Sequence, residues 1–178
     1  MASSHIRRCT PDDLPAVHVL LAQTWHATYD RWYGGEKMRE ITATWHAPER
    51  LAEQVDQPGS VFLVAADPDE IVATAFAHDV GESGVEIGRL YVSPSHQNSG
   101  IGAALLDTLI CAFPSADRFL LDVEPRHAGA IRFYRRHGFR CIVANAGCNP
   151  GLDLPHLRMW LMLHPPAGAA GPACPRSR

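Results

Sequence analysis

Apolar positions in the first third of the chain recur at helical spacing. After a short strand-like segment at residues 5–9, Thr10-Pro11-Asp12-Asp13 predicts a helix start. Thr is a common N-cap, Pro fits the first helical turn, and acidic side chains favour the positive end of a helix. Apolar residues then follow at intervals of three and four, at Leu14, Val17, Leu20, Leu21 and Trp25. Two further helices are predicted at about residues 36–45 and 48–55.

Strand-like patterns follow, and they later alternate with helical ones. Residues 61–66 and 71–78 are apolar and β-branched and are separated by Asp67-Pro68-Asp69, which predicts a hairpin. After a turn at 81–84, residues 85–92 form the next predicted strand. The remaining predicted elements are a helix at 100–113, a strand at 119–123, a helix at 128–137 ended by Gly138, and strands at 139–143 and 157–163.

This order of elements predicts an α/β fold with a mixed β-sheet flanked by helices. We expect residues 1–164 to form one domain, since 178 residues suit a single core. Residues 165–178 are rich in Pro, Gly and Ala and carry no periodic apolar residues, which predicts a flexible tail.

The composition argues against nucleic acid, membranes and metal ions as partners. The net charge of −3 and the lack of a Lys/Arg stripe argue against nucleic acid as a partner. No run approaches the ~20 apolar residues of a membrane span, and the start lacks a signal pattern, so we expect a cytoplasmic protein with no membrane partner. Five scattered cysteines without a C-x-x-C pair predict reduced thiols, and ten histidines without metal-site spacing predict no metal.

The strongest chemical signal is the segment Gln97-Asn98-Ser99-Gly100-Ile101-Gly102-Ala103, between a predicted strand and a predicted helix. Glycines at such a junction let backbone N–H groups converge, and the helix dipole adds positive potential. The loop can therefore bind a phosphate without a charged side chain. It lacks the G-K-[ST] of triphosphate-binding loops and the third glycine of dinucleotide-binding loops. A tight helix start without a ligand is the alternative interpretation.

Two motifs together resemble those of the GNAT (GCN5-related N-acetyltransferase) superfamily. The first is Leu90-Tyr91-Val92-Ser93-Pro94 followed by the glycine loop. The second is Leu121-Asp122-Val123, then Ala130-Ile131-Arg132-Phe133-Tyr134 and His137-Gly138-Phe139. Both occur in the family's order and spacing. The chain departs from the family pattern at Asn98 and Ser99, where Arg or Lys is frequent, and at His127, where many members carry Asn.

The resemblance implies the GNAT fold, acetyl-CoA as co-substrate without a metal, and acetyl transfer to a primary amine of a small molecule or peptide. It assigns contacts with the CoA moiety to Leu90, Tyr91, Val92, Gln97, Asn98, Ser99, Gly100, Ile101, Gly102, Ala103, His127, Ala130 and Phe133. In this family the Leu90 N–H would polarise the thioester, and the Val92 backbone would pair with the pantetheine arm.

The resemblance also implies two catalytic residues. Counted back from the loop, Glu86 occupies the position of the general base in the histone-acetylating branch, and Tyr134 matches the tyrosine that returns a proton to the CoA thiolate. Strand alternation places Glu86, Gly88 and Leu90 on one face, unless a bulge intervenes. An acceptor-binding or solvent-facing Glu86 and a packed Tyr134 are the alternatives.

An aromatic cluster in the first helical region suits the acceptor. Trp25, His26, Tyr29 and Tyr33, with Trp32 beside them, could hold an alkyl or cationic amine, although core packing explains each equally well. Two rival functions stay open: a non-catalytic CoA-binding or sensing domain, and an acyltransferase with a different acyl donor or acceptor. Dimers are common in similar proteins, and the sequence leaves a homodimer open.

Overall fold

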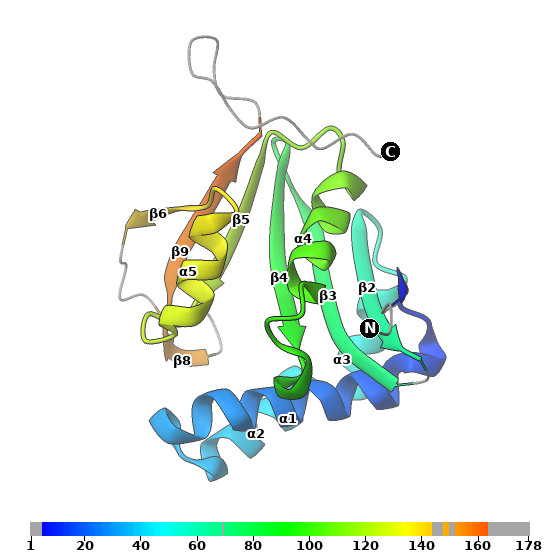
Figure 1. Ribbon diagram of the computed structural model, residues 1–178, viewed down its shortest axis with the longest axis vertical. Helices are drawn as coiled ribbons and strands as arrows, with labels where there is room; N and C mark the ends of the chain where they lie inside the picture. Colours follow the sequence, from blue (N-terminus) through cyan, green and yellow to red (C-terminus); the bar gives the residue numbers. More distant parts are fainter. Residues whose placement is uncertain (1–4, 69, 144–147, 150–151, 164–178) are drawn as a thin grey trace. The chain divides into compact units, whose positions relative to one another are not determined.

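The predicted strands form a mixed β-sheet with helices, in the order β1-β2-β3-β4-β5-β9-β6. This computed structural model describes residues 5–68, 70–143, 148–149 and 152–163 (Figure 1). They fall into two units. The first comprises the chain up to Ala77 with Arg89–Ala112, and the second comprises His78–Gly88 with the chain from Phe113 onward. Strands β3 (Glu70–Gly81) and β4 (Gly84–Val92) run through both. The predicted tail at 165–178 lies outside the described residues, and a single domain over 1–164 stays a prediction.

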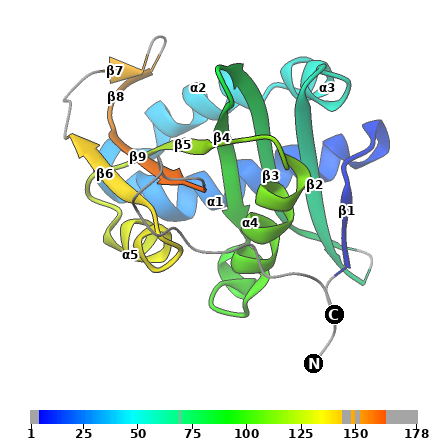
Figure 2. The ribbon, with the colours of Figure 1, turned by 90° about the horizontal axis from the view of Figure 1, so that it is seen from above.

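The first unit contains the three N-terminal helices, the first strands and the helix after the glycine loop. Its other elements are β1 (His5–Arg8), the 3₁₀ turns at Pro11–Asp13 and Pro94–His96, α1 (Leu14–Tyr33), α2 (Gly35–Trp45), α3 (Pro48–Val55), β2 (Ser60–Asp67) and α4 (Ile101–Ala112). The residues of β2 from Val61 to Ala65 are all buried, and Figure 2 shows α3 and α4 on opposite sides of this strand. Both faces are therefore covered, which explains an unbroken apolar run instead of alternation.

The core of the first unit forms where apolar side chains of two helices meet apolar side chains of β2. Val17 and Leu21 of α1 and Leu51 of α3 pack with Phe62 and Val64 of β2, and Val17, Leu21, Leu51 and Val64 are fully buried. The helical spacing of three and four and the strand spacing of two thus meet at one apolar interface.

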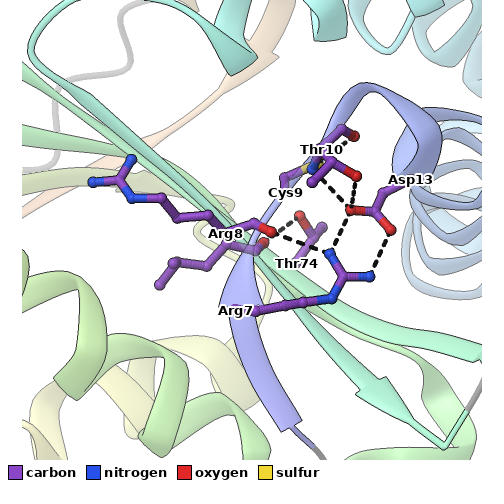
Figure 3. Close-up of polar contacts among 7 residues, drawn as sticks. Arg7, Arg8, Cys9, Thr10, Asp13 and Thr74 are labelled. Atoms are coloured by element: carbon purple, nitrogen blue, oxygen red, sulfur yellow. Dashed lines mark hydrogen bonds and ion pairs between the residues drawn. The ribbon is translucent and has the colours of Figure 1, made fainter.

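The predicted helix start is confirmed, with Thr10 as the N-cap and Asp13 as the N3 residue of a capping box. Both the backbone N–H and the hydroxyl of Thr10 donate to Asp13 Oδ2, at 2.8 and 2.9 Å, so Asp13 is the acceptor (Figure 3). The Arg7 guanidinium donates to both oxygens of Asp13, at 2.6 and 2.7 Å. The Arg7 hydrogen bonds, against the opposing effect of burial, lower the pKa of Asp13 to about 2.

The second unit is built on hydrogen-bonded strand pairs and the helix α5. Its elements are β5 (Arg118–Val123), α5 (Ala128–Arg136), β6 (Arg140–Val143), β7 (Cys148–Asn149), β8 (Leu152–Pro155) and β9 (Leu157–Met162). β5 pairs parallel with β4 and antiparallel with β9, and β6 pairs antiparallel with β9. The small β7–β8 hairpin was not predicted, because segments of 2 and 4 residues carry too little alternation to detect. Among the described residues, no helix has the length and apolar character needed to cross a membrane.

Candidate active site

The glycine loop has the backbone geometry that its sequence predicts. Gly100 has a φ of +90° and Asn98 a φ of +61°, in the left-handed region that glycine and asparagine tolerate best. A Cβ added at Gly100 would meet no atom within 4 Å, so the backbone angle, rather than a lack of space, requires glycine there. Ala104 N–H donates to Gly100 O at 3.1 Å as the helix opens. The amides of residues 101–103 precede this bond and have no partner within the helix.

The polar side chains of the loop hold the loop itself. The Gln97 amide donates to Val92 O at 3.1 Å, and the Ser99 hydroxyl donates to His96 O at 2.5 Å. Ser93 N–H donates to Val72 O at 2.8 Å and ties the end of β4 to β3. Because Gln97 and Ser99 already have backbone acceptors, the loop offers an anion mainly its backbone N–H groups. An arrangement of this kind fits the phosphates of CoA.

Strand β4 alternates as predicted in its first half. Val85, Ile87 and Arg89 are buried, whereas Glu86 is half-buried and Gly88 is exposed, so Glu86 and Arg89 point to opposite faces. Leu90, Tyr91 and Val92 are all half-buried at the end of the strand.

A buried arginine on β4 was not expected from the sequence. Arg89 is 8% exposed, donates to Gln54 Oε1 at 2.9 Å, and its guanidinium lies 5.4 and 5.8 Å from the Phe62 and Phe76 ring centroids. Among the described residues, no carboxylate lies within ion-pair distance of it. Burial lowers the pKa of Arg89 to about 10, which leaves the group protonated at neutral pH.

Part of the predicted acceptor cluster is assembled around Trp25. The Trp25 ring is 5.0 Å from that of Tyr29, 5.0 Å from that of His46 and 6.1 Å from that of Tyr91. Trp25 is only 8% exposed and therefore also belongs to the core. Burial raises the pKa of Tyr91. Tyr91, predicted as a CoA contact, thus lies against Trp25, one of the predicted acceptor residues of α1.

The other two predicted acceptor residues point to neighbours on α1 and α2. His26 Nδ1 lies 2.8 Å from Asp30 Oδ1, one helical turn away. The Lys37 ammonium lies over the Tyr33 ring, 5.8 Å from its centroid. His26 and Tyr33 are both partly exposed, so either can still meet a ligand.

In the second unit, Glu86 lies beside Arg158, which is hydrogen-bonded to a second carboxylate, that of Asp122. The β5–β9 register pairs Asp122 with Arg158. Arg158 Nε and Nη2 donate to the two oxygens of Asp122, each at 2.8 Å, and Nη2 lies 3.7 Å from Glu86 Oε1. The hydrogen bond with Asp122 raises the pKa of Arg158, with a further contribution from the charge of Glu86. Asp122 belongs to the second sequence motif, but nothing in the sequence indicated Arg158.

Tyr134 packs in an aromatic group with Phe133, one of the predicted CoA contacts of α5, and with Phe139. Tyr134 is 8% exposed, and its ring lies 5.2 Å from Phe133 and 5.5 Å from Phe139. His127 caps the helix, because its Nδ1 accepts the Ala130 N–H at 3.2 Å. The ring thus supplies the acceptor that an asparagine amide would otherwise offer, and it occupies the Ala130 amide. No group of three or more His, Cys, Asp or Glu side chains in the described part of the chain is arranged to hold a metal ion.

Comparison with known proteins identifies the motifs. The profile of the Acetyltransferase (GNAT) family matches residues 21–139, which include the glycine loop and Tyr134. A probable N-acetyltransferase of Mycobacterium tuberculosis is 26% identical over 175 residues, which is 92% of this chain and 96% of the relative. An uncharacterized N-acetyltransferase of Mycobacterium bovis is 30% identical over 93 residues, and the match spans 51% of this chain but only 60% of that relative.

Solved structures show the same fold. The PaiA N-acetyltransferase from Thermoplasma acidophilum, in complex with coenzyme A, has a TM-score of 0.81 at 19% identity, over 90% of this chain and 99% of its own. The ribosomal-protein-alanine N-acetyltransferase from Brucella melitensis has a TM-score of 0.70 at 23% identity, over 89% of this chain and 99% of its own. The predicted mixed sheet with flanking helices is therefore confirmed.

Proposed function

The chain belongs to the GNAT family of acetyltransferases, and we propose that it transfers an acetyl group from acetyl-CoA to a primary amine of a small molecule or peptide. The observation that carries the proposal is the glycine loop at the start of α4, within the matched family segment. Acetyl-CoA supplies the acetyl group in activated form, as a thioester.

The first unit holds the CoA moiety in this proposal. The N–H groups of residues 101–103 bind phosphate oxygens at the positive end of α4. Gln97 and Ser99 support the loop from within, so their substitution weakens binding through the loop shape. The end of β4 adds the backbone N–H of Leu90 for the thioester oxygen and the Val92 backbone for the pantetheine arm. The Leu90 donor acts where negative charge develops, which is where fixed dipoles accelerate a reaction most.

Glu86 of the second unit serves as the general base. An alkylamine with a pKa near 10.4 is protonated at neutral pH, and removing that proton at pH 7 costs about 4.6 kcal/mol. A positioned carboxylate, acting directly or through water, lowers this cost. Glu86 is suited to the task because the neighbouring cation, Arg158 Nη2, lies 3.7 Å away, beyond hydrogen-bond distance. Asp122 is less suited, since both of its oxygens accept hydrogen bonds from Arg158.

Tyr134 serves as the acid that protonates the leaving sulfur through its Oη. A phenol near pKa 10 and a thiol near 8.5 make complete transfer uphill by about 2 kcal/mol. A proton shared while the bond breaks avoids that cost. The buried position of the ring, between Phe133 and Phe139, fixes its orientation and keeps bulk water away.

The amine acceptor is assigned to the α1 residues Trp25, His26, Tyr29 and Tyr33. Aromatic faces attract cations and also contact alkyl chains. The acceptor is thus expected to be a primary amine, with amino-acid-derived or polyamine-like compounds ahead of larger aminoglycosides.

Binding and turnover test the proposal together. Acetyl-CoA in excess is expected to raise the melting temperature by mass action. Gly102→Asp places bulk and negative charge in the loop and abolishes the shift. Thr108→Asp is the matched control, because it adds the same charge at an exposed position further along α4 and is expected to keep the shift.

An amine panel, read out by thiol release, then separates the rival functions. Stabilisation by acetyl-CoA without turnover of any amine contradicts the enzymatic proposal and supports a sensing domain. Turnover with another acyl-CoA alone, or of alcohols alone, supports an acyltransferase of different donor or acceptor. An absent thermal shift at millimolar acetyl-CoA contradicts the family function as a whole.

A further inference from the structure

The guanidinium of Arg158 is locked in place by one carboxylate and lies next to another. Arg158 and Asp122 are directly paired in the β5–β9 register. Nε and Nη2 of Arg158 donate to the two oxygens of Asp122 at 2.8 Å each, a planar two-bond contact. The Asp122 side chain is only 15% exposed, so it has few other partners and fixes the orientation of the guanidinium.

Three of the five Arg158 N–H groups have no acceptor among the described residues. The pair with Asp122 uses Nε and one N–H of Nη2, which leaves the second N–H of Nη2 and both N–H groups of Nη1. The Arg158 side chain is 40% exposed, so a ligand can reach it. A guanidinium that is already oriented loses little further entropy when it binds a second oxygen.

The neighbouring Glu86 carboxylate is also partly exposed and accepts no hydrogen bond from Arg158. Its Oε1 is 3.7 Å from Arg158 Nη2, which is an ionic contact but too long for a hydrogen bond, and its side chain is 31% exposed. An anion with open lone pairs therefore stands beside a cation with open donors. Such a pair matches a group that carries an ammonium and a carbonyl or carboxylate oxygen on adjacent carbons, where nitrogen and oxygen are about 3 Å apart.

We propose that Arg158 determines acceptor specificity by binding the oxygen next to the reacting amine. The preferred acceptors are then α-amino compounds, either peptide N-termini and amino-acid amides, through the carbonyl, or free amino acids, through the carboxylate. Simple alkylamines lack this oxygen and react less well. The inference rests on the proposed function, with Glu86 as the base.

Matched acceptors test the role of Arg158. The wild-type protein and Arg158→Met are assayed with L-alaninamide and with 3-methyl-2-butylamine, which has nearly the same shape but no oxygen. The ratio of the two kcat/KM values is compared between proteins, so the different basicities of the amines cancel. Loss of a hydrogen bond from a charged donor predicts that the ratio falls about 10- to 100-fold in Arg158→Met. Arg158→Lys keeps the charge but not the planar fork, so it is expected to restore the ratio partly. L-alanine as a third acceptor distinguishes the carboxylate from the carbonyl.

The outcomes separate this inference from the proposed function. An unchanged ratio in Arg158→Met overturns the specificity role. If both amines then react more slowly by the same factor, Arg158 only positions Glu86. If the wild-type protein acetylates neither these nor other amines, the proposed function itself fails. Arg158→Met leaves Asp122 without its partner, so Asp122→Asn with Arg158→Met is the substitute should the single variant not fold. A normal acetyl-CoA thermal shift verifies that either variant is intact.

Discussion

Acidification is expected to destabilise the protein through His46, a histidine buried next to Trp25. His46 is 3% exposed, and its Nδ1 has no hydrogen-bond partner among the described residues. Burial, together with the positive charges of Arg89 and His18, lowers the pKa of His46 to about 3. In the unfolded chain a histidine titrates near 6.5.

The sign and size of the effect follow from proton linkage. Between pH 6.5 and about 3, the unfolded state binds one proton more than the folded state at His46, so stability falls as the pH is lowered. Each pH unit below 6.5 costs about 1.4 kcal/mol, which amounts to about 2 kcal/mol at pH 5. Above pH 7, His46 is neutral in both states and contributes no slope.

Urea unfolding of wild type and His46→Phe between pH 7.5 and 5.0 measures this contribution. Phe keeps a ring against Trp25 but cannot bind a proton. The difference in unfolding free energy between the two proteins is expected to change by about 2 kcal/mol across this range, in favour of the variant at low pH. Circular dichroism and tryptophan fluorescence must give the same transition for the free energies to be comparable. His5→Gln, at an exposed position, is the control and is expected to leave the slope unchanged. Parallel pH profiles for wild type and His46→Phe would show that protonation of His46 does not destabilise the folded state.

Four further predictions concern single residues of the two units. Arg7 lowers the pKa of Asp13 to about 2, so the stability that Asp13 contributes is complete above pH 4 and disappears as the pH falls toward 2. Asp13→Asn should remove this pH dependence and lower the free energy of unfolding by about 1–2 kcal/mol at pH 7, as measured by urea unfolding. Gly100→Ala forces a Cβ onto a φ of +90°, so we expect a loss of about 1–2 kcal/mol and a smaller acetyl-CoA thermal shift; an unchanged shift would show that the loop tolerates the strain. Tyr134→Phe should lower kcat while acetyl-CoA affinity stays nearly constant, and a normal kcat at saturating substrates would exclude the acid role. Glu86→Gln should lower kcat/KM by roughly 10- to 1000-fold, with a loss that shrinks as pH rises; an equal loss at every pH would indicate acceptor binding instead.

The fold was predictable because its elements are long and their periods are clear. The apolar spacing from Leu14 to Trp25 predicted α1. The two apolar runs on either side of Asp67 predicted β2 and β3 to within a few residues. The glycine loop was also predictable, since a φ of +90° at Gly100 is a requirement that the residue type itself reveals. The β7–β8 hairpin was missed because its strands are too short to show a period.

The polar contacts of the site could not be predicted, because they depend on the register of the paired strands and on how deeply each side chain is buried. Arg158 meets Asp122 across 36 positions of sequence only because β5 and β9 pair in one particular register. The burial of Arg89 was also hidden, since a charged residue in an alternating strand is ordinarily assigned to the solvent face. Trp25 was proposed for the acceptor, and only the structure shows that it also packs against His46 and Tyr91.

This chain is proposed to move an acetyl group from acetyl-CoA to a primary amine. The most direct measurement follows free thiol and acetylated amine in the same reaction, with thiol detected by a chromogenic reagent and the amine product by mass spectrometry. We expect equal amounts of both products with the wild-type protein, saturation in both substrates, and loss of both products in Gly102→Asp but not in Thr108→Asp. Thiol release without any acetylated amine across the panel, or no release at all from a protein that acetyl-CoA stabilises, would contradict the proposal.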